Sequence, residues 1–286
     1  MRTILLSSLF LAAVFLFVYE AAAREEVPTP VKASLISDVN AIVPGKPFKV
    51  GVLLEIIPHW HVYWKNPGEA GLPTGVGFRL PAGFTAGELN WPVPGVFKGA
   101  GDITGYGYEN TLLLYSRVNV PEGLRTGSEE VISADVSWVS CEEICIPGKA
   151  RLELKLPVSD NQQQVNAELF SRWESALPLM PSDEKSPFKV GIGSTEKNKA
   201  SEIINITLSH KKSVSNIELY PVPGNELSVS NITVNNSHEE GKTDIKLEVR
   251  ALSGRELKET NLETLLVYID KGGKRSGVRL DIPIGN

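Results

Sequence analysis

The chain has 286 residues, a net charge of -5 and an ordinary apolar content of 42%. This length fits about two domains, each with a hydrophobic core. Because the charge is mild and basic residues do not cluster, we do not expect nucleic acid as a partner.

The N-terminus predicts a secretory signal peptide over residues 1–23. Arg2 precedes an apolar run from Ile4 to Val18, and Ala21–Ala23 offer small residues for cleavage. The run is shorter than the about 20 apolar residues of a membrane span. An uncleaved N-terminal anchor is the alternative. We expect a mature, soluble chain from about residue 24, on the oxidising side of a membrane, where disulfides persist.

Residues 24–158 read as short strands rich in branched side chains and separated by Gly/Pro turns. This pattern is typical of an antiparallel β-sandwich. The long Gly/Pro-rich connection over residues 81–110 is expected to be functional or mobile. The expected strands are Val31–Val39, Phe48–Ile57, His61–Lys65, Val76–Leu80, Leu112–Val120, Val131–Val139 and Arg151–Val158.

A helical connector is expected over residues 159–183, followed by a second β-sandwich domain over residues 184–286. Asp160 or Asn161 is the expected N-cap, and Pro178 and Pro181 end the helix. Its apolar stripe is Val165, Leu169, Trp173 and Leu177. The later strands are expected at Glu202–Ser209, Ile217–Val222, Leu227–Val234, Asp244–Leu252, Thr264–Asp270 and Val278–Ile284.

The sequence holds two cysteines, Cys141 and Cys145. A disulfide that closes so small a loop contributes at most about 2 kcal/mol through chain entropy. A purely structural role is therefore weakly supported, although it stays open. Two nearby thiols are also what disulfide exchange requires, because one attacks a partner and the other resolves the mixed disulfide.

Strand alternation gives a first placement of Cys141. Ile132, Ala134, Val136 and Trp138 share the face that belongs in the core. Continued alternation puts Cys141 on the opposite, polar face, at a strand end where a partner can reach it. This weakly favours Cys141 as the attacking thiol, and the sequence leaves that choice undecided.

A copper or zinc site is an alternative. His59 and His61 point to one face of a strand with Tyr63, while Trp60, Val62 and Trp64 point to the other, core face. Two histidines and two cysteines can form a tetrahedral site. Nothing in the sequence brings the two pairs together, however, and such histidines are more often polar positions on a half-buried strand.

Several motifs, in order along the chain, resemble the N-terminal periplasmic domain of the DsbD/ScsB thiol:disulfide interchange proteins. The resemblance covers about Val31 to Val158, and the rest is similar to the two-subdomain periplasmic region of the ScsB-like branch. The motifs are Trp60–Pro73 (WHVYWKNPGEAGLP), Trp91–Pro92, Gly105–Tyr106 and Cys141–Pro147 (CEEICIP).

The resemblance implies an immunoglobulin-like redox domain with Cys141 and Cys145 as its active pair. The family relays electrons from a membrane-embedded domain to periplasmic thioredoxin-fold proteins, a role tied to cytochrome c biogenesis. It also implies a mobile cap loop with an aromatic cover, for which the candidates are Phe97, Tyr106 and Tyr108. Since the chain shows no multi-helix membrane domain, a separate membrane-embedded electron donor is expected.

The sequence therefore predicts an all-β protein with two immunoglobulin-like sandwiches that relays reducing equivalents through Cys141 and Cys145, as a protein-disulfide reductase or exchange component. No dissociable cofactor and no metal are expected. The rivals are a non-enzymatic binding module with a structural disulfide and a periplasmic copper- or zinc-binding protein.

Overall fold

The computed structural model describes residues 29–285 except 212, 238–240 and 253–255. The predicted signal peptide lies outside the described residues. None of the helices in the described part of the chain has the length and apolar character needed to cross a bilayer. Residues 31–286 form one compact unit.

Ten strands fill the first half of this unit, with one turn of 3₁₀ helix, η1 (Ala100–Asp102). The strands are β1 (Val31–Ser37), β2 (Phe48–Ile56), β3 (His61–Gly68), β4 (Gly75–Arg79), β5 (Thr85–Ala86), β6 (Gly95–Lys98), β7 (Thr104–Glu109), β8 (Thr111–Asn119), β9 (Glu129–Cys141) and β10 (Cys145–Pro157).

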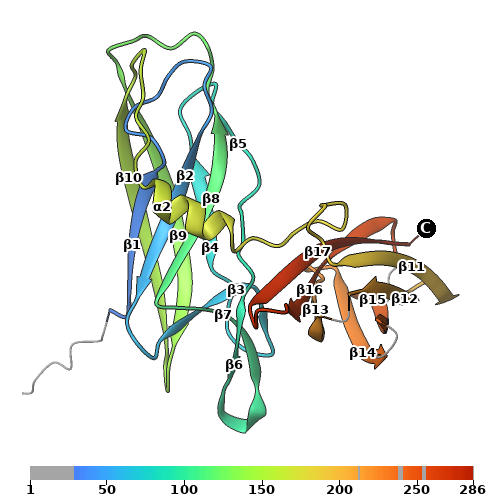
Figure 1. Ribbon diagram of the computed structural model, residues 1–286. Helices are drawn as coiled ribbons and strands as arrows, with labels where there is room; N and C mark the ends of the chain where they lie inside the picture. The colour runs from blue at the N-terminus through green and yellow to red at the C-terminus, as the bar shows by residue number, and fades with distance from the viewer. Residues whose placement is uncertain (1–28, 212, 238–240, 253–255, 286) are drawn as a thin grey trace, which may run out of the picture. The chain divides into compact units, whose positions relative to one another are not determined.

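These strands form two antiparallel sheets (Figure 1). One has the order β1-β2-β8-β5, and the other has the order β10-β9-β3-β7-β6, with β4 also paired to β9. β3 and β4 therefore follow one another along the same edge of β9. The strand β9 is the long spine of the second sheet, and β10 pairs with it over its whole length.

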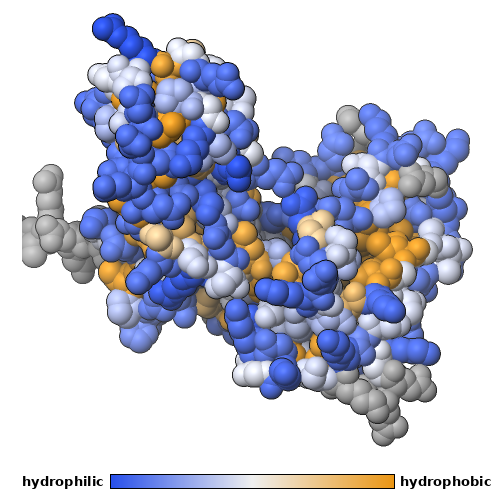
Figure 2. Space-filling view, turned by 45° about the horizontal axis from the view of Figure 1, so that its top comes forward, coloured by the Kyte–Doolittle hydropathy of each residue, from blue (hydrophilic) through white to orange (hydrophobic). Residues whose placement is uncertain are grey.

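Alternating side chains build the core between these sheets. Ile132, Ala134 and Val136 on β9 are buried, while the residues between them are more exposed. Trp60 and Trp64 lie in the same core cluster, as the alternation of β3 predicts. A strand such as β9 thus buries one face, which is the arrangement of a sandwich, while β8 is buried on both faces from Leu112 to Ser116. Where the outward faces are visible in Figure 2, polar residues predominate between smaller apolar patches.

Seven further strands follow a short helix, α2 (Ala167–Glu174). They form two more antiparallel sheets, β11-β12-β15-β14 and β13-β16-β17, around a second hydrophobic cluster. The strands are β11 (Phe188–Lys197), β12 (Ser201–His210), β13 (Ser215–Val222), β14 (Leu227–Ser237), β15 (Lys242–Ala251), β16 (Thr260–Ile269) and β17 (Arg275–Ile284).

The prediction of an all-β, immunoglobulin-like architecture with a short intervening helix is confirmed. The helix boundary was wrong. The N-cap is Asn166, in the left-handed region at φ 55°, rather than Asp160 or Asn161. Its side chain donates to the Ser37 carbonyl at 2.9 Å, so a contact distant in sequence fixes the helix start. The domain boundaries at residues 158 and 184 stay a prediction.

The connection over residues 81–110 is also more ordered than the sequence suggested. It contains β5, β6, η1 and β7, and β6 pairs with β7 as a hairpin at the sheet edge. Glycines and prolines masked these short strands, because β propensity is low for both residue types. This hairpin brings Phe97 to β3, next to the cysteine pair.

Candidate functional site

The two cysteines close the end of the β9–β10 hairpin. They are direct register partners, with Cα atoms 4.2 Å apart, and they form a disulfide. Only Glu142, Glu143 and Ile144 lie between them, and the Glu142 amide donates to the Ile144 carbonyl at 3.1 Å. β10 begins at Cys145 rather than at the expected Arg151, so the pairing of β9 and β10 extends to the disulfide itself.

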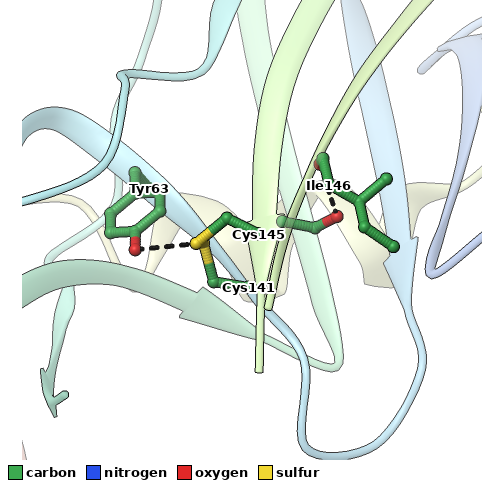
Figure 3. The surroundings of a disulfide bond; sticks show 5 residues. Tyr63, Cys141, Cys145 and Ile146 are labelled. Atoms are coloured by element: carbon green, nitrogen blue, oxygen red, sulfur yellow. Dashed lines mark hydrogen bonds between the residues drawn. A yellow bond between two sulfur atoms is a disulfide. The ribbon is translucent and has the colours of Figure 1, made fainter. Parts of the chain in front are cut away.

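A side-chain hydrogen bond fixes the hairpin beside the disulfide. The Ser140 hydroxyl donates to the Ile146 carbonyl at 3.1 Å, and Ser140 itself is fully buried. Figure 3 shows this bond on one side of the sulfur atoms and the Tyr63 ring on the other. The disulfide therefore lies on a rigid strand end.

The two sulfur-bearing residues differ sharply in exposure. Cys141 is 3% exposed, whereas Cys145 is exposed and follows Ile144, which is 61% exposed. This corrects the expectation that Cys141 would be the accessible cysteine. Strand alternation does place Cys141 opposite the core face, but neighbouring strands cover that face at this point.

Tyr63 from β3 is part of that cover. Its hydroxyl donates to the Sγ of Cys141 at 3.3 Å, and the side chain is 6% exposed (Figure 3). Burial raises the pKa of the Tyr63 hydroxyl. The hydroxyl therefore keeps its proton at neutral pH and serves as a donor to the sulfur. The sequence placed Tyr63 on the right face without giving it this role.

Two glycines make room for the Tyr63 ring. A Cβ on Gly71 would lie 2.4 Å from that ring, and one on Gly105 would lie 3.3 Å from it. Gly71 also has a φ of 94°, which side-chain-bearing residues rarely adopt. Gly71 in the loop after β3 and Gly105 in β7 thus leave the space in which the Tyr63 ring packs against Cys141.

A series of rings continues from Tyr63 towards the surface. His61 contacts Tyr63 edge-on with ring centroids 5.2 Å apart, and Phe97 from β6 stacks on His61 at 4.5 Å. His61 is half-buried, and burial lowers its pKa, while the Glu109 carboxylate acts in the opposite direction. Strand β3 thereby lines up two side chains beside the buried cysteine.

The three cap-loop candidates fall in different places. Phe97 stacks on His61, which is the cross-strand neighbour of Cys141. Tyr106 instead contacts Tyr220, with ring centroids 4.1 Å apart. Tyr108 is buried in the core, where its hydroxyl donates to the Pro92 carbonyl at 2.7 Å. Phe97 is thus the candidate that the fold brings next to the cysteine pair.

The histidine pair does not complete a metal site. His59 is exposed on the turn before β3 with a φ of 73°, while His61 lies within β3 opposite Cys141. Within the described ranges, no group of three or more His, Cys, Asp or Glu side chains is placed to hold a metal ion. The hypothesis of a four-ligand copper or zinc site therefore has no geometric support.

An apolar pocket of about 470 Å³ opens beside the hairpin end. Trp138 and Val139 of β9 and Pro147 and Gly148 of β10 line it, together with Leu72, which is 63% exposed. A Cβ on Gly148 would lie 2.3 Å from the Trp138 ring, so this glycine lets the indole lie across β10. The pocket starts at Pro147, two residues from Cys145.

Fold and site together define an immunoglobulin-like β-sandwich protein with a disulfide at a hairpin end, one sulfur buried and the other exposed. Residues 29–157 match the family model described as "Thiol:disulfide interchange protein DsbD, N-terminal". This part of the chain, which carries both cysteines, belongs to that family. The resemblance seen in the sequence motifs is thus confirmed.

A solved structure supports the fold over a longer stretch. The N-terminal periplasmic domain of ScsB from Proteus mirabilis aligns with a TM-score of 0.60 and 15% identity, covering 89% of this chain and 94% of that one. BcpA, the major pilin subunit of Bacillus cereus, aligns with a TM-score of 0.27 and 12% identity over 88% of this chain and 66% of that one, which carries no argument. No match was found among curated protein sequences.

Proposed function

We propose that this protein is a periplasmic thiol:disulfide exchange protein that relays reducing equivalents through Cys141 and Cys145. The observation that carries this proposal is the asymmetry of the disulfide: an exposed Cys145 bonded to a buried Cys141. Exchange needs one sulfur that a partner can reach and a second that resolves the mixed disulfide. A disulfide of purely structural use gains nothing from this arrangement.

The reaction runs in two displacements. In the reduced protein the Cys145 thiolate attacks a partner disulfide, forms a Cys145–partner disulfide and releases one partner thiolate. The Cys141 thiolate then attacks the Cys145 sulfur, the bond to the partner breaks, and the second partner thiolate leaves. The partner disulfide gains two electrons and two protons, and the Cys141–Cys145 disulfide is formed. No cofactor takes part.

The expected partners are thioredoxin-fold periplasmic proteins as electron acceptors and a separate membrane-embedded protein as donor. Membership of residues 29–157 in the interchange family supports partners of this kind. The apolar pocket that begins at Pro147, two residues from Cys145, supports docking of a polypeptide, because such a pocket can accept an apolar side chain of a partner. Phe97, stacked on His61, is the proposed cover of the site.

The test is the reduction potential of the Cys141–Cys145 pair, measured by equilibrating the protein with glutathione or dithiothreitol buffers and counting thiols. A potential of roughly -120 to -270 mV with fast exchange, the range of known thioredoxin-fold exchangers, is expected. A potential well below about -300 mV with slow exchange would mean a structural bond. The binding-module reading would then replace the relay.

A further inference from the structure

A histidine lies next to the buried cysteine on the neighbouring strand. In the ladder between β3 and β9, His61 is the direct partner of Cys141. Cβ atoms of such pairs lie about 4.5–5.5 Å apart. Tyr63, two residues further along β3, reaches the Cys141 sulfur from the same face. One strand therefore brings an imidazole and a phenol to the same buried thiol.

The surroundings of His61 hold its ring in place. β6 contributes Phe97, an uncharged ring stacked on the imidazole at an interplanar angle of 8°. β7 contributes Glu109, the other ladder partner of His61 and an exposed carboxylate. Tyr63 contacts His61 from its own strand, and Cys141 is its ladder partner on β9.

The exposed hairpin turn adds two carboxylates, Glu142 and Glu143, directly after Cys141. Negative charge next to a cysteine opposes formation of its thiolate. A group that takes up the Cys141 proton would offset this effect. Tyr63 does not suit that role, because burial raises its pKa and its hydroxyl already donates to the sulfur.

We propose that His61 is the proton acceptor of Cys141 in the resolving step of exchange, an inference that rests on the proposed function. In the mixed disulfide, the Cys141 thiol passes its proton to the imidazole. The resulting thiolate attacks the Cys145 sulfur, the bond to the partner sulfur breaks, and that sulfur leaves as a thiolate. The imidazolium then returns the proton to water or to the leaving thiolate.

Burial suits His61 to this task. It lowers the pKa of the imidazole in the disulfide form, so His61 is neutral at neutral pH and free to accept a proton. A protonated His61 next to a Cys141 thiolate is a pair of opposite charges in a half-buried site. Such a pair stabilises the thiolate and lowers the thiol pKa.

The test follows the two steps separately with dithiobis-nitrobenzoate as the oxidant. The protein is reduced, and release of coloured nitrothiobenzoate is recorded by stopped flow. The first release reports attack by Cys145 and depends on reagent concentration. The second reports resolution by Cys141 and is independent of the reagent concentration.

The variants are His61→Phe, which keeps a ring against Phe97, and His61→Gln. The control is His59→Asn, at an exposed turn position with positive φ that Asn tolerates.

We expect the second release to slow about fivefold near pH 6 in both His61 variants. Loss of the proton acceptor leaves less of Cys141 as thiolate at that pH, and the higher intrinsic nucleophilicity of a more basic thiolate offsets part of this loss. The variants should also regain the steep pH dependence of an ordinary thiol, and His59→Asn should match the wild type.

Two other outcomes overturn the inference at different levels. If the His61 variants keep the rate and pH profile of the wild type, His61 is a packing residue for Phe97, and the exchange function stands. If no second release occurs in the wild type at any pH, Cys141 does not resolve the mixed disulfide, and the proposed function fails with the inference. Thermal unfolding of each variant, followed by circular dichroism, identifies a variant that has not folded.

Discussion

The two halves of the described chain are built alike and differ in their cysteines, which both lie in the first half. Both pack antiparallel sheets around a hydrophobic cluster, and both contain strands that alternate buried and exposed residues. The second half keeps this alternation on strands such as β12 and β15 and carries no cysteine. In the first half, at the end of β9, Ser140 and Cys141 are buried on opposite faces.

The burial of both faces at the end of β9 marks the position of the candidate redox site. A strand end with both faces covered must have neighbours on its outer side, and here β3, β6 and the loop after β3 supply them. The second half contains no cysteine. Changes in the two halves should therefore separate exchange from stability.

The largest effect is expected from the cysteines themselves. Cys145→Ser should abolish exchange, because the buried Cys141 cannot reach a partner. Cys141→Ser should still attack, and should accumulate a mixed disulfide that does not resolve. Mass spectrometry after a pulse of dithiobis-nitrobenzoate would distinguish the two. Accumulation of the adduct on Cys141 in Cys145→Ser would show that Cys141 can attack, and would contradict the assignment of Cys145 as the attacking cysteine.

A core truncation in the second half should cost stability and leave exchange intact. Ile206 is fully buried in β12, and Ile206→Ala should lower the free energy of unfolding by about 2–5 kcal/mol. Leu113→Ala, at a fully buried position of β8, is the matched change in the first half. Urea unfolding and nitrothiobenzoate release measure the two properties. Slower release in Ile206→Ala under native conditions would show that the second half acts on the site.

Gly71→Ala should disturb the site from outside the cysteine hairpin. The added Cβ would lie 2.4 Å from the Tyr63 ring, at a φ of 94°. Overpacking of this kind costs about 1–3 kcal/mol, and the ring must move away from Cys141. Gly127→Ala is the control, since its φ is 88° and nothing lies within 4 Å of the added atom. Equal loss of stability and equal exchange rates in the two variants would contradict a role of Gly71 in placing Tyr63.

Tyr63→Phe removes the hydrogen bond to Cys141 and keeps the ring. A hydrogen bond to a thiolate is stronger than one to a disulfide sulfur, so its loss destabilises the reduced form more. The potential should become more negative by up to about 30 mV, which corresponds to about 1.4 kcal/mol. Tyr268→Phe, a buried tyrosine of the second half, is the control and should not change the potential. A shift towards positive values would mean that the hydroxyl favours the disulfide.

The smallest effect concerns the stability of the oxidised protein below neutral pH. Burial lowers the pKa of His61 from its ordinary 6.5, so the unfolded chain binds the proton first as pH falls. The contribution of His61 to the free energy of unfolding is thus fully present above about pH 6.5, and it is lost as the pH falls through and below that value. Subtracting the unfolding free energies of His61→Phe from those of the wild type between about pH 7 and pH 5 isolates it. A difference that grows in favour of the wild type on acidification would contradict this sign.

The strand content, the core face of β3 and β9, and the family of the first half could be predicted from the sequence. Period-2 alternation of Ile132, Ala134 and Val136 and of Trp60, Val62 and Trp64 carries that information, because burial of one strand face is a local constraint. The motifs around the cysteines carried the resemblance. The sequence pattern did not predict the helix start, the short Gly/Pro-containing strands or the extent of β10. Each of these depends on a partner elsewhere in the chain.

The tertiary structure was needed to show which sulfur is exposed and which side chains surround the other. Alternation predicts the direction of the Cys141 side chain but not what lies above it. Tyr63, Phe97 and Gly71 come from three separate segments, and their meeting at Cys141 depends on the order of strands in the sheet. Exposure is a property of all neighbours together, which is why a sequence pattern around one cysteine could not assign it.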